Sequence, residues 1–278
     1  MNFDLAQLDD GDLASALADQ AGQHLLALRA ERFASHGVQD DEMLKTLGDD
    51  ADRTANDLIV TTLKKLRPND AILSEESTDD LARLDAERVW IVDPLDGTRE
   101  YKTAGRTDWA VHIALWERAR HDVDRSADRS GPFGSLTLGV VGLPALGMVL
   151  RSDQVSIAQT ATNSPLRIIR SASRSQPVAE GVAQILKAEL VSMGSAGAKA
   201  MAVVRGEADA YIHTGGQWEW DSAAPVQVAL GHGLFVVRVD GSPIRYNQRD
   251  PYLPDLVMCR PDLADQVMTA VRKVAGSL

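Results

Sequence analysis

Apolar residues recur at three- and four-residue intervals in two segments near the N-terminus, which is the spacing of one face of an α-helix. The first series follows acidic residues typical of a helix start and predicts a helix over residues 12–33. The second series predicts a helix over residues 52–66, which ends at the turn-forming residues that begin with Pro68. The chain is therefore expected to open with two amphipathic helices.

Shorter apolar runs come next, and their length is typical of β-strands. Residues 71–73 form an apolar run and residues 88–92 form another after the initial Arg88, whereas residues 109–115 carry large apolar side chains at every second position. Residues 136–151 are apolar but broken by glycine and proline, which predicts a strand, a turn and a second strand. The charged segment 118–134 has no periodicity and predicts a solvated hairpin loop.

The second half of the chain alternates between strand-like and helix-like segments. Strands are predicted over residues 167–170, 190–193, 208–212 and 234–239, and helices over 178–188, 196–205, 221–230 and 263–274. This alternation indicates an α/β layer, whereas the first half has more antiparallel signals. We therefore expect an N-terminal α+β subdomain over residues 1–150 and a C-terminal α/β subdomain over residues 151–278.

Composition narrows the range of partners. The 278 residues carry a formal net charge of −11, which repels nucleic-acid polymers and anionic membranes but does not exclude a small anionic substrate. The single cysteine, Cys259, excludes an internal disulfide and is typical of a reducing compartment. Because the acidic N-terminus has no apolar stretch of signal-peptide length and no segment is long enough to span a membrane, we expect a cytoplasmic protein.

Acidic residues follow predicted strands or open a predicted helix at three places. Glu75, Asp93 with Asp96, and Asp221 occupy these places. Each alone has an ordinary explanation, as a solvated strand end, a turn or a helix cap. If the four carboxylates converge, their repulsion is relieved by divalent cations, and a set made only of oxygen ligands favours magnesium or manganese over zinc.

Three motifs, which follow one another along the chain, support the convergence of these four carboxylates on one site. Residues 74–77 (Ser-Glu-Glu-Ser), residues 90–98 (Trp-Ile-Val-Asp-Pro-Leu-Asp-Gly-Thr) and residues 220–224 (Trp-Asp-Ser-Ala-Ala) resemble the three metal-binding motifs of the inositol-monophosphatase superfamily. The resemblance runs from the first predicted helix to the last. It implies an α/β (α+β) fold, a layered αβαβα sandwich of the sugar-phosphatase type, and a magnesium-dependent phosphomonoesterase.

The resemblance also implies roles for single residues. Two or three Mg²⁺ ions, for which Mn²⁺ is a possible substitute, would be bound by Glu75, Asp93, the carbonyl of Leu95, Asp96 and Asp221. Catalysis would rest on Thr98, Asp52 and Glu75, with Thr98 orienting the attacking water. The family motif around Asp52 is absent here, so Asp49 is the alternative for its role.

Substrate contacts implied by the resemblance lie at Leu95, Asp96, Gly97, Thr98, Arg99, Lys199 and Asp221. The sequence Arg99-Glu100 after Thr98 is similar to the CysQ-type nucleotidase branch of the family, whereas inositol-phosphate enzymes usually have Thr-Asn there. A second phosphate would need a basic contact, for which Arg99, Lys199, Arg174 and Arg245 are candidates. Either Trp218 or Tyr101 offers a ring on which adenine could stack.

Three functions are compatible with these observations. The resemblance implies lithium-sensitive hydrolysis of 3′-phosphoadenosine 5′-phosphate to AMP and phosphate in sulfate assimilation, with the 5′-phosphosulfate analogue as a further expected substrate. The alternative is an inositol-monophosphate or fructose-1,6-bisphosphate phosphatase with the same metal site. A third alternative is a non-catalytic, metal-dependent binding protein. In each case the expected partner is a small phosphate ester, with neither nucleic-acid polymer nor membrane, and a homodimer is a further possibility.

Overall fold

The computed structural model describes residues 5–36, 41–119, 134–154 and 165–276, so most of the predicted hairpin loop over residues 118–134 lies outside the described residues. Within these ranges ten strands form two five-stranded sheets. The first contains, in spatial order, β1 (Ala71–Ser74), β2 (Arg88–Asp96), β3 (Ala110–Arg118), β4 (Gly134–Leu143) and β5 (Met148–Arg151). The second contains β7 (Glu189–Met193), β6 (Arg167–Ser171), β8 (Ala210–Trp218), β10 (Tyr252–Cys259) and β9 (Phe235–Val237).

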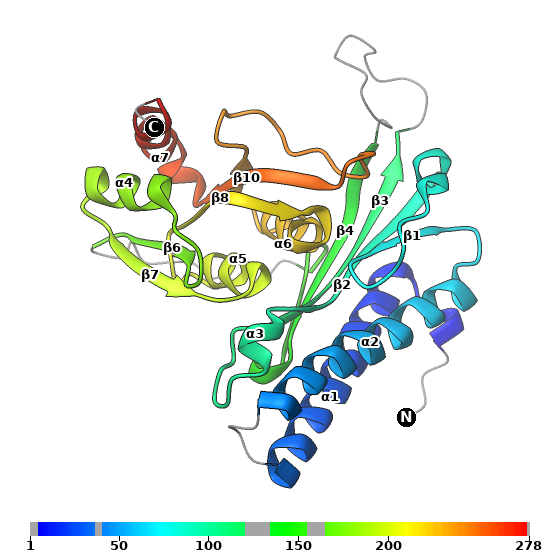
Figure 1. Cartoon of the computed structure of the whole chain (residues 1–278). Helices are drawn as coiled ribbons and strands as arrows, with labels where there is room; N and C mark the ends of the chain where they lie inside the picture. The colour runs from blue at the N-terminus through cyan, green and yellow to red at the C-terminus, as the bar shows by residue number, and fades with distance from the viewer. Residues whose placement is uncertain (1–4, 37–40, 120–133, 155–164, 277–278) are drawn as a thin grey trace.

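Helices cover both sheets and fill the space between them (Figure 1). The first sheet is covered on its outer face by α1 (Asp10–His36) and α2 (Asp41–Leu66), and the second by α4 (Pro177–Leu186) and α7 (Ala264–Ala275). Between the sheets lie α5 (Ala196–Val204) and α6 (Glu219–Gly231). This order of layers is the predicted αβαβα sandwich. None of the described helices is both long and apolar enough to cross a membrane.

Strand β2 is buried on both faces from Val89 onward, and its residues 89–92 are all apolar. Successive side chains of a strand point to opposite faces of the sheet. Val89 and Ile91 accordingly pack in the core between the two sheets, whereas Trp90 and Val92 pack in the core under α1 and α2. The strand is thus held from both sides, which makes its C-terminal end a rigid place from which to position side chains.

Helix α2 begins at Asp41, well before the predicted start at residue 52. Glycine weakens helices, and Gly48 lies in the part of α2 that was not predicted. In the structure Gly48 is buried, and a Cβ atom there would lie 3.0 Å from Lys102 and 3.1 Å from Thr98. The glycine therefore allows α2 to approach the short helix α3 (Thr98–Tyr101), which the sequence did not predict.

Strand β10 was also not predicted from the sequence. It contains Pro254, which lacks a backbone N–H, and the register with β8 shifts between Leu253 and Asp255. Proline within an apolar run is a signal against a strand, so the sequence pattern did not predict β10. In the structure β10 pairs with β8 on one side and with β9 on the other.

The strands of the first sheet all end by Arg151, and those of the second all begin after it. However, α6 packs against the first sheet as well as the second, so residues from both halves share one core. The division into subdomains over residues 1–150 and 151–278 therefore stays a prediction.

Candidate active site

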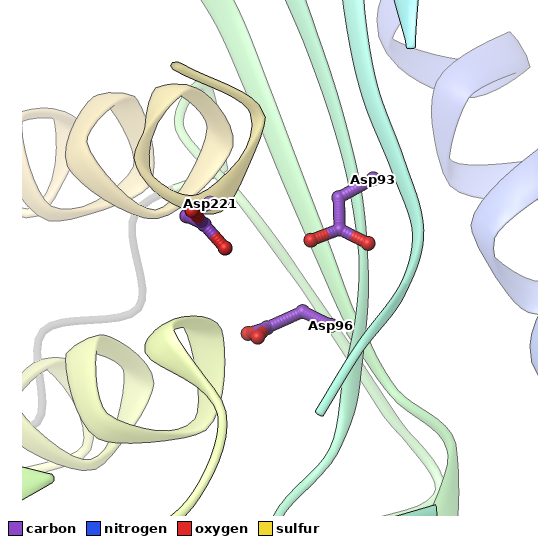
Figure 2. Close-up of side chains that lie close together, drawn as sticks. All are labelled: Asp93, Asp96 and Asp221. Atoms are coloured by element: carbon purple, nitrogen blue, oxygen red, sulfur yellow. The ribbon is translucent and has the colours of Figure 1, made fainter. Parts of the chain in front are cut away.

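The end of β2 presents two aspartates on the same side of the sheet. The pairing of β2 with β3 is interrupted between Asp93 and Asp96, and the backbone N–H of Leu95 donates to Oδ1 of Asp93 at 3.0 Å. Gly97 follows with a φ of 89°, which is a left-handed conformation that glycine adopts without strain. This turn brings both carboxylates to face α6 (Figure 2).

Helix α6 supplies the third aspartate. The helix begins at Glu219, and the carboxylate of Asp221 accepts a hydrogen bond from the backbone N–H of Trp218 at 2.6 Å. Asp221 is therefore the third residue of α6 rather than its N-cap, and its side chain caps the helix from within the first turn while also facing β2 (Figure 2). One carboxylate oxygen from each of Asp93, Asp96 and Asp221 lies within 4.8 Å of the others.

Two carboxylates of this cluster have raised pKa values, which indicates a cation site. We call Asp93, Asp96 and Asp221 the acidic cluster. Burial and the carboxylates of Glu75 and Asp96 raise the pKa of Asp93 well above its usual value. Burial and the Asp96 charge raise the pKa of Asp221 to about 6. Oδ2 of Asp93 is also buried without a hydrogen-bond partner among the described residues. A hard divalent cation would relieve the repulsion and satisfy this oxygen, so these residues fit a magnesium or manganese ion.

Asp96 differs from its neighbours because donors surround one of its oxygens. Oδ2 accepts hydrogen bonds from the hydroxyl of Ser195 at 2.5 Å and the backbone N–H of Gly197 at 2.6 Å, and it lies 3.2 Å from Nε2 of His112. Burial alone would raise the pKa of Asp96, but the hydrogen bond and charge of His112, with help from Lys199 and Ser195, hold it below its usual range. Asp96 is therefore ionised and held in place.

Three of these donors were not predicted from the sequence. Ser195 and Gly197 lie a few residues before Lys199, a predicted substrate contact, and the φ of 46° at Ser195 is a non-glycine exception that the sequence does not reveal. His112 lies inside an apolar strand, where its polarity was the only available signal. Nothing in its spacing indicated that it would face Asp96.

Glu75 lies at the edge of the acidic cluster rather than within it. It follows β1, and its backbone N–H donates to the carbonyl of Val92 at 3.2 Å, which continues the pairing of β1 with β2. Desolvation by neighbouring protein atoms and the charge of Asp221 raise the pKa of Glu75 to about 7, although the residue is exposed. The loop is held by Ser74, whose hydroxyl donates to Oδ1 of Asn56 at 2.7 Å.

Thr98 lies next to the acidic cluster and contacts α2. Its hydroxyl oxygen lies 3.3 Å from Oδ1 of Asp52 and 3.3 Å from the carbonyl oxygen of Leu95. Burial and the nearby charge of Glu76 raise the pKa of Asp52 to about 7. Of the two aspartates considered for this role, Asp52 is in contact with Thr98, whereas Asp49 is exposed.

Lys199 is buried, and its ammonium group donates to the carbonyl oxygens of Gly194 at 3.2 Å and Ser195 at 2.5 Å. Burial lowers its pKa to about 8. In this arrangement Lys199 stabilises the loop that holds Asp96, and its direct contact with a substrate stays a prediction. Arg99, by contrast, is exposed on α3.

The two aromatic candidates for base stacking have different surroundings. Tyr101 is fully buried, its hydroxyl donates to the carbonyl of Leu25 at 2.7 Å, and its ring meets the edge of Trp109. The interpretation of Tyr101 as a stacking residue was therefore wrong, because core packing covers its ring. The side chain of Trp218 is 43% exposed.

Comparisons with known proteins agree with this geometry. The model of the "Inositol monophosphatase family" matches residues 7–123 and 134–275. A 3′-phosphoadenosine 5′-phosphate phosphatase from Mycobacterium leprae is 52% identical over 272 residues, which covers 97% of this chain and 96% of the relative. The 3′(2′),5′-bisphosphate nucleotidase CysQ of Escherichia coli K12 is 29% identical over 208 residues, or 73% and 80% of the two chains.

Solved structures show the same fold at lower identity. CysQ from Bacteroides thetaiotaomicron superposes with a TM-score of 0.69 at 24% identity, covering 91% of this chain and 98% of the other. An IMPase from Thermotoga maritima superposes with a TM-score of 0.70 at 19% identity, covering 97% and 99%.

The layered fold and the acidic cluster at the end of β2 define a class of α/β proteins with a carboxylate-lined cation site between two sheets. Within that class, the chain belongs to the inositol monophosphatase family. The family and the oxygen-only acidic cluster agree that the site is one for metal ions.

Proposed function

We propose that this chain is a phosphomonoesterase that hydrolyses the 3′-phosphate of 3′-phosphoadenosine 5′-phosphate, releasing AMP and inorganic phosphate. The observation that carries the proposal is the convergence of Asp93, Asp96 and Asp221 within 4.8 Å, beside the hydroxyl of Thr98. The names of the mycobacterial relatives, at 50% and 52% identity, support the nucleotide as substrate. The 5′-phosphosulfate analogue has the same 3′-ester and is included in the proposal, which links the reaction to sulfate assimilation in the cytoplasm.

In this reaction a water oxygen forms a bond to phosphorus while the bond to the 3′-oxygen breaks, and the leaving oxygen takes up a proton. Cations bound at the acidic cluster would lower the pKa of water and neutralise phosphate charge. The Thr98 hydroxyl can donate to Asp52 and still accept a hydrogen bond from the water. Asp52, once ionised, thereby orients the attacking water through Thr98. Glu75, at the edge of the acidic cluster, is the other candidate proton acceptor.

Magnesium is the proposed ion, in two or three copies, and manganese is the proposed substitute. Glu75, Asp93, the Leu95 carbonyl, Asp96 and Asp221 are the proposed ligands. Carboxylate and carbonyl oxygens suit these hard ions, and no sulfur or imidazole is proposed as a ligand. Hydrogen bonds to Oδ2 of Asp96 leave its other oxygen for a metal.

The second phosphate requires a basic group near the acidic cluster, and Arg174 is the candidate that the geometry favours. Its guanidinium donates to the carbonyl of Gly216 at 2.7 Å, and its charge is among those that oppose the raised pKa of Asp221. The side chain is exposed, so a phosphate can approach it. Lys199 has two of its donors engaged by backbone carbonyls.

The proposal is tested by measuring phosphate release from 3′-phosphoadenosine 5′-phosphate, fructose 1,6-bisphosphate and inositol 1-phosphate under a magnesium titration. We expect kcat/KM to be highest for the nucleotide, by about tenfold or more, because a second phosphate and a base add contacts. Equal values on all three substrates would contradict the nucleotide assignment but not the metal site. Arg99→Thr should lower kcat/KM more for the nucleotide than for inositol phosphate if Arg99 contributes to this preference.

A further inference from the structure

Three aromatic residues, which we call the aromatic platform, form a stack at the C-terminal end of β8 in which Trp218 and Tyr252 are exposed and Trp220 is partly buried. The rings of Trp218 and Trp220 stack with centroids 5.5 Å apart and planes at 15°, and Tyr252 meets Trp218 at 78° with centroids 5.7 Å apart. The side chain of Trp218 is 43% exposed and that of Tyr252 is 47% exposed. Large rings left in contact with water lose hydrophobic stabilisation, so an ordered and exposed stack is typical of a binding surface.

The backbone is shaped to build this platform. Tyr252 and Trp218 are directly opposed in the pairing of β10 with β8. Two residues before Trp218, Gly216 adopts a φ of 77°, and a Cβ atom there would lie 2.3 Å from the Tyr252 hydroxyl. Only glycine leaves room for the tyrosine ring at this point. The aromatic rings are therefore held in fixed positions rather than left as loose surface side chains.

The platform is attached directly to the acidic cluster. The backbone N–H of Trp218 donates to the carboxylate of Asp221 at 2.6 Å, and the carbonyl oxygen of Trp220 lies 3.1 Å from Nδ1 of His112. His112 in turn contacts Asp96. Among the described residues, Trp218 and Tyr252 are the exposed large aromatic residues, and the contact between the Trp218 backbone and Asp221 connects them to the acidic cluster.

We propose that the aromatic platform is the subsite on which the purine base of the substrate stacks, with Trp218 as the principal contact. This inference rests on the proposed nucleotidase function and adds to it a residue that determines specificity. A flat, rigid indole offers stacking area with little loss of side-chain freedom. Sugar and inositol phosphates lack an aromatic ring, so the platform would favour nucleotides over them.

The test compares Trp218→Ala, Trp218→Phe and Leu230→Ala with the unchanged chain. Leu230, which is 48% exposed near the C-terminal end of α6, is the matched control for removing an exposed apolar side chain. Activity is measured with 3′-phosphoadenosine 5′-phosphate and with glycerol 2-phosphate, an ester without a base. We expect Trp218→Ala to lower kcat/KM for the nucleotide about tenfold more than for glycerol 2-phosphate, mainly through KM. Trp218→Phe should recover most of the loss, and Leu230→Ala should leave both values unchanged.

A binding measurement separates this inference from the proposed reaction. By calorimetry, the unchanged chain should bind AMP about tenfold more tightly than ribose 5-phosphate, and Trp218→Ala should remove that difference. If the unchanged chain fails to hydrolyse the nucleotide but shows this difference, the proposed reaction is wrong and the base subsite stands. If Trp218→Ala, shown by circular dichroism to be folded, retains both the difference in binding and the preference in kcat/KM, the subsite assignment is overturned.

Discussion

Nε2 of His112 lies 3.2 Å from Oδ2 of Asp96, and the other ring nitrogen lies 3.1 Å from the carbonyl oxygen of Trp220. Both nitrogens therefore face acceptors. Burial alone would lower the pKa of His112, but the hydrogen bond and charge of Asp96 overcome this effect and raise it. The imidazole thus connects β3 to the start of α6 and positions a proposed metal ligand, which is a role that commonly affects metal affinity.

Replacing His112 should therefore weaken metal binding. We expect His112→Phe to raise the magnesium concentration for half-maximal activity and to lower kcat/KM about ten- to hundredfold, because Asp96 loses a donor. His112→Gln can place an amide nitrogen near Asp96 and should lose less. The measurement is a magnesium titration of activity for both variants. If both variants keep the magnesium dependence of the unchanged chain, His112 does not position Asp96 for metal.

Asp93 is the most buried carboxylate of the acidic cluster, with 1% exposure. Asp93→Asn should lower turnover by roughly a hundredfold or more, because the site loses the charge that offsets the cations. The fold should survive without metal, since the change removes a carboxylate that its neighbours repel. The measurements are turnover with magnesium present and the midpoint of thermal unfolding in a chelator. The exposed Asp265→Asn on α7 is the control, and near-normal turnover of Asp93→Asn would contradict its role.

The contact between Thr98 and Asp52 gives a prediction for pH. The raised pKa of Asp52, at about 7, means that its carboxylate forms as the pH rises through this value. If that carboxylate orients the attacking water through Thr98, kcat should rise over the same range. Asp52→Asn should lower kcat by roughly tenfold or more, leave KM nearly unchanged and remove this rise. A pH profile for Asp52→Asn that has the same rise would assign the ionisation to another group.

The parts of the site that could be predicted from the sequence are those encoded by neighbouring residues. The Asp-Pro-Leu-Asp-Gly-Thr string places Asp93 and Asp96 together because the turn between them is local. The convergence of Asp221 was expected from a resemblance. Strand β2 and helix α6, which carry these residues, were predicted from the apolar runs that they bury.

The remaining features depend on contacts between distant residues. His112 contacts Asp96 from β3, and Ser195 contacts it from the loop before α5. No local sequence pattern predicts these contacts. The identity of Tyr101 as an aromatic residue did not reveal that α1 covers it, with a hydrogen bond to Leu25. The predicted start of the second helix at residue 52 left out Gly48, whose packing against α3 is a contact between distant parts of the chain.

The last prediction concerns Glu219, which is fully buried at the start of α6 and accepts hydrogen bonds from the backbone N–H groups of Asn247 and Gln248 at 2.6 and 2.7 Å. Burial raises its pKa from 4.5 to about 7. Between these values the folded chain keeps the proton and the unfolded chain loses it. The contribution of Glu219 to stability therefore falls as the pH rises through this window, by roughly 3 kcal/mol.

The Glu219→Gln variant has no titrating group at this position. Its free energy of unfolding should therefore lack the pH dependence that Glu219 contributes and keep the pH dependence of all other groups. We expect the stability advantage of the unchanged chain over Glu219→Gln to shrink by about 2–3 kcal/mol between about pH 5 and pH 8. The variant should be the less stable chain at about pH 5, because one backbone N–H then faces an amide group that cannot accept it. Urea unfolding of both chains in a chelator at the two pH values measures the difference. A constant difference would mean that Glu219 is already ionised in the folded chain at about pH 5, with the two backbone N–H groups outweighing its burial.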